Sequence, residues 1–168
     1  MHLYGDLIPR RKDTALKRPD LELSEFMPYL INRVGAALVQ RFTRDALQDT
    51  HLTIGTWRLL LAMSNHAGTR QVDLAEFTSI EVSTVSRLVT RLAQLGLVSR
   101  SRSAKSNREV VVDLTPKGRA LVAALVPIAA ELEQAATRGV SGKELAAVKR
   151  VLRRMHRNLT AGDGASGQ

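Results

Sequence analysis

The sequence predicts a mainly α-helical protein with a small β-wing, in which a winged helix-turn-helix lobe is flanked by terminal helices. Three observations predict this fold class. Apolar residues recur at helical spacing along most of the chain. Two short helical segments are joined by a tight turn, and two strand-like runs follow them directly. The loop between these runs is rich in Ser, Lys and Arg, which suits a wing tip that meets a polyanion.

The composition indicates a folded, strongly basic protein. A chain of 168 residues is most simply one domain with a sizeable core, and 44% hydrophobic content argues against general disorder. Lys and Arg number 25 against 16 acids, and the net charge of +9 favours a polyanionic partner. Nucleic acid is the first candidate and an anionic membrane the second, while a solvated basic surface without a partner is the alternative.

No cluster of residues indicates catalysis. The absence of Cys excludes disulfides, thiolate nucleophiles and cysteine zinc sites. The four histidines, His2, His51, His66 and His156, lack metal-type spacing, and the sequence shows no catalytic acid pair or glycine-rich phosphate loop. We therefore expect no enzyme, no metal and no cofactor. Since no signal-peptide core or membrane span is recognisable, we expect a cytoplasmic protein without a membrane partner.

The two ends of the chain differ in character from the rest. Residues 1–20 mix Pro with Lys and Arg without steady periodicity, which predicts an arm. Such an arm could contact DNA or wrap a partner subunit, or it could be a plain tail. Residues 162–168 are small and polar, which predicts a disordered tail.

Helical spacing predicts three helices in the first half of the folded region. The first should begin at Ser24 as N-cap and run to about Leu47, with Leu30, Val34, Leu38 and Phe42 recurring every four residues. The second should begin after Thr53 as N-cap and end at Gly68, with Trp57, Leu60, Leu61 and Ser64 along one face. The third should span 71–78, with a core face of Val72, Leu74, Ala75 and Phe77.

The stretch 82–108 carries the clearest two-sided pattern. Its apolar stripe consists of Val85, Leu88, Val89, Leu92 and Leu95, and its opposite face of Ser83, Thr84, Arg87, Thr90, Arg91 and Gln94. Gly96 should end the helix, and strands are expected at 97–100 and 109–114. No acid occurs between Glu81 and Glu109. A helix that runs into a hairpin with a basic tip predicts a winged helix, with the helix in the major groove of DNA and the wing in the minor groove.

Two further helices are expected after the wing. Thr115 and Pro116 provide an N-cap and N1 residue for the first, whose inner face is Leu121, Leu125, Ile128 and Leu132 and which Pro127 should bend. Ser141 and Glu144 have capping-box spacing for the second, in which Leu145, Val148, Leu152, Met155 and Leu159 recur at near-heptad spacing. We expect 51–115 to bind DNA and 21–50 with 116–161 to dimerise. The alternative is that the terminal helices pack only on their own lobe.

A set of short runs combines into a specific pattern. The runs are Leu74-Ala75-Glu76, Ser83-Thr84-Val85-Ser86-Arg87-Leu88-Val89, Arg91-Leu92, Leu95-Gly96-Leu97-Val98 and Leu114-Thr115-Pro116-Lys117-Gly118. Together, over about 52–121, they resemble MarR-type winged-helix transcriptional regulators. The resemblance implies a homodimer with interlocking terminal helices that binds a short inverted repeat in a promoter. It also implies repression that a small molecule, often an aromatic acid or phenol, relieves.

The wing departs from the pattern of that family. The resemblance implies an Asp-x-Arg before the second strand, and this chain has Ser106-Asn107-Arg108. Arg108 matches the arginine that reaches the minor groove, but Ser106 replaces the acid that helps to hold it. The wing is therefore expected to be looser or anchored elsewhere.

The candidate DNA contacts fall into three groups. Ser83, Thr84, Ser86 and Arg87 should face base edges and phosphates, with Arg87 able to make a bidentate contact to guanine. Arg70 and Gln71 are candidates for positioning a phosphate, and Arg91 is a candidate for contact with either a base or the backbone. Arg100, Arg102 and Lys105 should form a field that releases counterions from DNA. For Arg91 and Arg100 a plain solvated face is the alternative.

A ligand site is expected where the first helix, the Trp57 helix and the helix from 116 meet the lobe. The side chains that could orient an aromatic acid there are Tyr29, Asn32, Arg33, His51, Trp57 and Arg58. For Arg33, a surface or inter-subunit salt bridge is the alternative. The positive charge would also suit an aromatic acyl-CoA.

The sequence therefore favours a homodimeric, ligand-responsive transcriptional repressor. A non-specific architectural DNA-binding protein without a ligand is the alternative within DNA binding. A basic peripheral module that uses the last helix to bind a membrane or a protein is the alternative from another class.

Overall fold

The computed structural model describes residues 21–102 and 110–161. The chain divides into two compact units, residues 1–36 and 37–168, which are described separately. The predicted arm at 1–20, the wing tip with Lys105, Ser106 and Arg108, and the tail at 162–168 lie outside the described residues.

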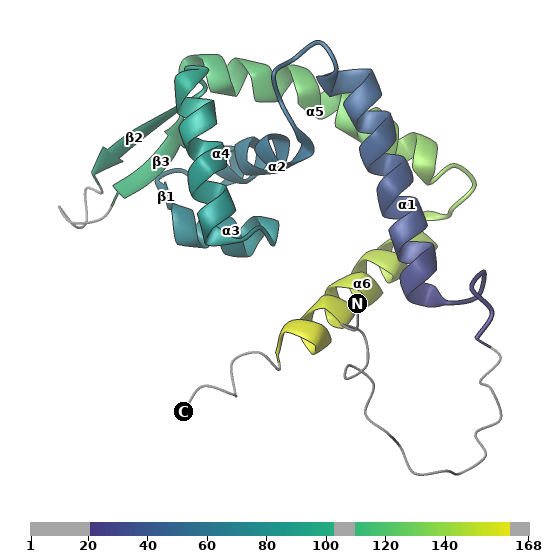
Figure 1. The fold of residues 1–168 in the computed structure, drawn as a ribbon. Coiled ribbons are helices and arrows are strands. Elements are labelled where there is room, and N and C mark those ends of the chain that lie inside the picture. Colours follow the sequence, from purple (N-terminus) through teal and green to yellow (C-terminus); the bar gives the residue numbers. More distant parts are fainter. Residues whose placement is uncertain (1–20, 103–109, 162–168) are drawn as a thin grey trace, which may run out of the picture. The chain divides into compact units, whose positions relative to one another are not determined.

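The first unit contains the start of helix α1 (Met27–Phe42), which begins three residues later than the sequence predicted (Figure 1). Ser24 lies three residues before the first residue of α1, and its hydroxyl donates to Glu22 Oε1 at 2.7 Å. The Phe26 carbonyl accepts the first helical hydrogen bond, from the Leu30 amide. Leu30 and Val34 are exposed, so the predicted apolar stripe is not buried in this part of the chain.

The second unit opens with the end of α1, a π-helical turn η1 (Thr43–Leu47) and helix α2 (Ile54–Asn65). Phe42 and Leu47 are buried. The helical segment formed by α1 and η1 together ends at Leu47, as the sequence predicted. The N-cap role of Thr53 is confirmed. Its side chain accepts from the Thr56 amide at 3.3 Å, and the Thr56 hydroxyl accepts from the Thr53 amide at 2.8 Å. These two bonds satisfy donors that a helix N-terminus leaves open.

The helix-turn-helix consists of α3 (Gln71–Thr78) and α4 (Val82–Gln94), with Ser79 in the left-handed conformation between them. Leu74 and Ala75 are buried as predicted. The prediction for Val72 and Phe77 is wrong, since these side chains are 50% and 52% exposed. Thr78 is buried in their place because its hydroxyl finds a partner within the helix, the Leu74 carbonyl at 2.6 Å.

The wing belongs to a three-stranded antiparallel sheet of order β1-β3-β2 (Figure 1). Strand β2 (Val98–Arg102) pairs with β3 (Val110–Leu114), and Val98 lies opposite Leu114. Strand β2 extends two residues beyond the predicted end at 100. Strand β1 (Thr69–Arg70) was not predicted; it pairs Thr69 with Val112.

The apolar stripe of α4 is confirmed as its core face. Val85, Val89 and Leu92 are fully buried, while Leu88 and Leu95 are half-buried. They join a core that also includes Leu59, Leu60, Leu74 and Val112, all fully buried. Because α2, α3 and the sheet enclose one side of α4, its polar side is held outward.

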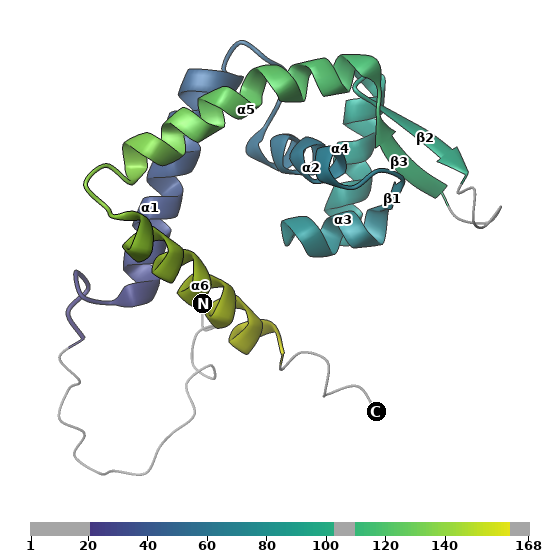
Figure 2. The same ribbon diagram turned by 180° about the vertical axis from the view of Figure 1, so that it is seen from behind.

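Helices α5 (Pro116–Ala136) and α6 (Gly142–Thr160) follow the sheet. The Thr115 side chain caps α5 by accepting from the Gly118 amide at 3.1 Å, as predicted. Helix α5 continues through Pro127 to Ala136 (Figure 2). The capping box of Ser141 and Glu144 is confirmed at the start of α6. No residue of α6 is buried, and the Lys149 ammonium forms an ion pair with Glu133 of α5 at 2.5 Å.

Candidate nucleic-acid interface

The outward side of α4 presents the residues that the sequence singled out as DNA readers. Ser83, Ser86 and Arg87 are exposed, and Thr84 is half-buried. Arg87 Nη2 donates to Thr84 Oγ1 at 3.1 Å, so the guanidinium already lies along the helix surface. The remaining donors of a planar guanidinium match the N7 and O6 acceptors of guanine. The arrangement therefore suits base readout by the N-terminal half of α4.

Two neighbours of these residues were missed in the sequence. Glu81, the N-cap of α4, is exposed, and its Oε2 accepts a hydrogen bond from Ser83 Oγ at 3.1 Å. An acid in this position can accept from cytosine N4 and repels a phosphate. Val82, the first residue of α4, is 48% exposed and can contact a thymine methyl group. The sequence pattern did not single out Val82, because a valine at helical spacing from the apolar stripe is expected to be in the core.

Arg91 and Arg100 form specific bonds within the lobe. Arg91 Nη2 donates to the His51 carbonyl at 3.0 Å and connects α4 to the loop before α2. Arg100 Nη2 donates to Thr90 Oγ1 at 2.7 Å and connects β2 to α4. Each guanidinium has five N–H donors, so one internal bond is compatible with a backbone contact as well. These two bonds therefore attach α4 to the loop before α2 and to β2.

Arg70 immediately precedes α3 and is engaged by an acid. Its Nε and Nη2 donate to Asp73 Oδ2 and Oδ1 at 2.8 and 2.6 Å. This hydrogen bond holds the pKa of the Asp73 carboxyl below its ordinary value. Gln71 is half-buried in the first turn of α3, and Arg102 is exposed at the end of β2. Contacts of Arg70, Gln71 and Arg102 to a DNA backbone stay predictions.

Of the residues predicted to bind a ligand, three lie in the first unit. Tyr29, Asn32 and Arg33 follow one another on α1, and the Arg33 guanidinium lies over the Tyr29 ring, 5.7 Å from its centre. The structure thus gives Arg33 a cation–π contact within α1, and a salt bridge to a second subunit stays the alternative.

The other three lie in the second unit. Trp57 is only 5% exposed and packs on Phe42, with ring centres 5.3 Å apart, so its indole is part of the core. His51 is exposed and gives its carbonyl to Arg91. Arg58 is exposed and lines a pocket between α2 and α3.

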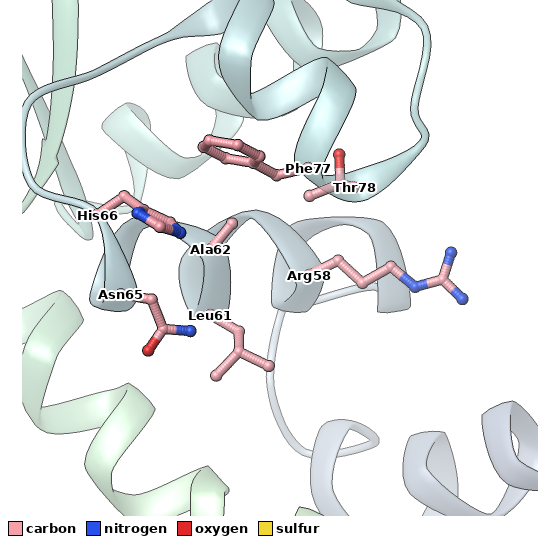
Figure 3. Close-up of a pocket in the computed structure, with 7 residues that line it drawn as sticks. All are labelled: Arg58, Leu61, Ala62, Asn65, His66, Phe77 and Thr78. Atoms are coloured by element: carbon pink, nitrogen blue, oxygen red, sulfur yellow. The ribbon is translucent and has the colours of Figure 1, made fainter. Parts of the chain in front are cut away.

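This pocket has a volume of about 510 Å³ (Figure 3). It is lined by Arg58, Leu61, Ala62, Asn65, His66, Phe77 and Thr78. The rings of His66 and Phe77 are stacked, with centres 4.7 Å apart and planes at 28°. Figure 3 shows this stack towards one end of the lining and the Arg58 side chain towards the other. The pocket thus offers an aromatic wall and a cation, which is the chemistry that an aromatic acid requires.

The chain resembles known proteins over its winged helix-turn-helix lobe and beyond it. Residues 52–110 match the MarR family, in good agreement with the 52–121 expected from the sequence. The HTH-type transcriptional repressor NicR of Pseudomonas putida is 30% identical over 134 residues, which cover 80% of this chain and 84% of NicR. The chain belongs to the MarR family. It is a DNA-binding transcriptional regulator with the winged helix-turn-helix fold of that family.

Two solved structures extend the comparison. Bordetella bronchiseptica BpsR, whose DNA binding is regulated by 6-hydroxynicotinic acid, is 31% identical with a TM-score of 0.72, covering 80% of this chain and 96% of BpsR. MepR of S. aureus, solved as a DNA complex, is 26% identical with a TM-score of 0.72, covering 80% of this chain and 96% of MepR. In this MarR-family chain no helix of residues 21–102 and 110–161 is long and apolar enough to cross a membrane.

Proposed function

We propose that this protein is a homodimeric, sequence-specific repressor that a small aromatic acid or its CoA thioester releases from a pseudo-palindromic promoter site. One observation carries the proposal: the fully buried stripe of Val85, Val89 and Leu92 holds Ser83 and Arg87 outward on α4. A rigid helix with exposed polar residues near its N-terminus suits docking in the major groove. Repression is supported by the similarity to the repressor NicR.

Dimerisation is supported by apolar side chains that the single chain leaves exposed. In the first unit, Leu23 and Val34 are 56% and 58% exposed, and in α6, Val148 and Leu159 are 50% and 77% exposed. A second copy of the chain would cover such residues from both units. We assign 21–50 and 116–161 to the dimer and 51–115 to DNA. A symmetric dimer presents two copies of α4 to an inverted repeat.

The residues on the lobe are proposed to make different kinds of contact with DNA. Ser83, Thr84, Ser86 and Arg87 would read bases, and Arg108 would enter the minor groove. Arg70, Gln71, Arg91, Arg100, Arg102 and Lys105 would contact or neutralise the backbone. For Arg91 and Arg100 the bonds to the His51 carbonyl and to Thr90 support an additional role in bracing α4.

The proposal is tested by competition between two kinds of duplex. An operator is first selected from a random pool with the full-length protein and is then competed with unrelated duplex at a fixed, physiological salt concentration. We expect a preference of about 10³-fold or more for the selected site, and an inverted repeat within it. Equal binding of both duplexes would instead support the non-specific architectural protein, and a monomer in light scattering would contradict the dimer.

The effector is proposed to bind at the pocket of Figure 3, with its carboxylate on Arg58 and its ring against Phe77. The similarity to BpsR supports an aromatic acid of the size of 6-hydroxynicotinic acid. Tyr29, Asn32, Arg33 and His51 do not line this pocket, and their part in ligand binding stays a separate prediction. Trp57 would act indirectly, because its buried ring fixes the position of α2.

Replacing Phe77 with alanine should weaken effector binding without weakening operator binding. Loss of an aromatic wall removes about 0.5–1.5 kcal/mol besides the buried area, so we expect about tenfold weaker binding of 6-hydroxynicotinic acid in calorimetry. Val72→Ala is the control, since Val72 is equally exposed on the same helix but does not line the pocket. Equal affinities of the Phe77→Ala and Val72→Ala proteins would contradict this site.

A further inference from the structure

Most of the positive charge of the chain lies outside the winged helix-turn-helix lobe. Helix α6 contains six cations and one acid, which gives it a net charge of +5, whereas the whole chain has +9. The same helix has no buried residue, and its ion pair with Glu133 attaches it to α5. The binding of an operator by α4 therefore leaves the largest concentration of charge unexplained.

Five of these cations form one face of the helix, which we call the α6 basic face. It consists of Lys143, Arg150, Arg153, Arg154 and Arg157. At 100° per residue they lie within one half-turn, opposite the stripe of Leu145, Val148, Leu152, Met155 and Leu159. All five are exposed, and none has a carboxylate at ion-pair distance within residues 21–102 and 110–161. The sixth cation, Lys149, is the one that pairs with Glu133.

We propose that the α6 basic face binds the backbone of a second duplex DNA segment while α4 holds the operator. The assignment of the operator to α4 and of the apolar stripe of α6 to the dimer rests on the proposed function, whereas DNA binding by the α6 basic face can be measured independently of it. The protein would then bridge two duplexes, which is an activity beyond the recognition of one promoter site.

The chemistry of the α6 basic face suits the phosphate backbone of duplex DNA. Four of its five cations are arginines, whose planar fork binds phosphate oxygens in pairs. From Lys143 to Arg157 the helix rises about 21 Å, and one strand of B-DNA places about six phosphates along that length. The number of cations thus nearly matches the number of phosphates that lie alongside.

The opposite stripe argues against a membrane as the partner. A helix that lies on a bilayer inserts its apolar face and keeps its cations at the headgroups. In the proposed homodimer the apolar stripe of α6 is covered by the second copy. The α6 basic face is then left outward alone, and a purely basic surface suits a polyanion without an apolar phase.

The test is the capture of a second duplex by a complex that already holds its operator. Biotinylated operator duplex on beads is saturated with the full-length protein and washed, and a fluorescent random-sequence duplex is added at low salt. The test variant carries Arg150→Gln, Arg153→Gln, Arg154→Gln and Arg157→Gln, because Gln keeps the helix propensity of Arg. The matched control carries Lys at the same four positions, which keeps the charge.

We expect wild type and the Lys control to capture the second duplex and the Gln variant to capture at least about tenfold less. Operator affinity should change by less than about twofold, since the four positions lie outside the lobe. In solution, the slope of log K for random-duplex binding against log salt concentration should become less negative by about 3.6 when four phosphate contacts are removed. This last readout needs no operator and so remains decisive if the proposed function fails.

Three outcomes would overturn the proposal. The Gln variant could capture the second duplex as well as wild type does, or wild type could capture none. Wild type could bind anionic phosphatidylserine vesicles more tightly than random duplex, with the Gln variant losing that binding, which assigns the face to a membrane. The Gln variant could be a monomer in light scattering, which would assign the α6 basic face to the dimer interface.

Discussion

Replacing Arg87 with alanine is expected to weaken operator binding by about 1–3 kcal/mol, or about 5- to 150-fold. Arg87 lies on the exposed side of α4, and its bond to Thr84 Oγ1 at 3.1 Å holds the guanidinium along the helix before DNA arrives. A side chain that is already oriented loses less entropy when it binds a guanine edge. The loss should therefore be concentrated in the selected operator and be small for random duplex.

The measurement is a titration of operator and random duplex with each variant over a range of salt concentrations. Lys105→Ala is the comparison, because a backbone contact should weaken both duplexes alike and lower the salt slope by about one. Thr84→Val should reproduce part of the Arg87→Ala loss, since it removes the acceptor that orients the guanidinium. An Arg87→Ala protein that bound its operator as tightly as wild type would show that α4 is not the reader.

The sequence predicted best those elements whose signals are local. The stripe of α4, the N-caps at Thr53 and Thr115 and the capping box at Ser141 each depend on residues within one or two helical turns. Strand β1 has no such signal, because its two residues form a strand only through pairing with Val111 and Val112. Its existence follows from the tertiary structure and not from any period in the sequence.

In the candidate interface, too, local patterns were predictable and long-range contacts were not. The pattern placed Arg70, Arg91 and Arg100 near the interface, but it did not predict the partners that hold them. Arg91 finds the His51 carbonyl, which lies 40 residues earlier in the chain, and no local rule connects the two. Phe77 was expected in the core from its spacing, yet it lines a pocket because His66 stacks on it from the end of α2.

The largest expected effect on stability comes from Gly118→Ala, at about 3 kcal/mol or more in the free energy of unfolding. A Cβ on Gly118 would overlap the backbone carbonyl oxygen of Leu97 and lie 3.3 Å from Leu114 Cδ2. The carbonyl cannot easily move, because it accepts the Thr115 amide at 3.1 Å and fixes the entry into α5. Glycine at this position therefore allows the first turn of α5 to lie directly against the chain that leads into β2.

Gly142→Ala is the matched control, since a Cβ there would meet nothing within 4 Å and the residue opens α6. It should change the free energy of unfolding by no more than about 0.5 kcal/mol. Both variants are compared with wild type by urea unfolding at one protein concentration, because a dimer makes the midpoint depend on concentration. A Gly118→Ala protein within about 1 kcal/mol of wild type would mean that α5 can shift away from Leu97. The packing of the first turn of α5 against Leu97 would then tolerate a displacement of the helix.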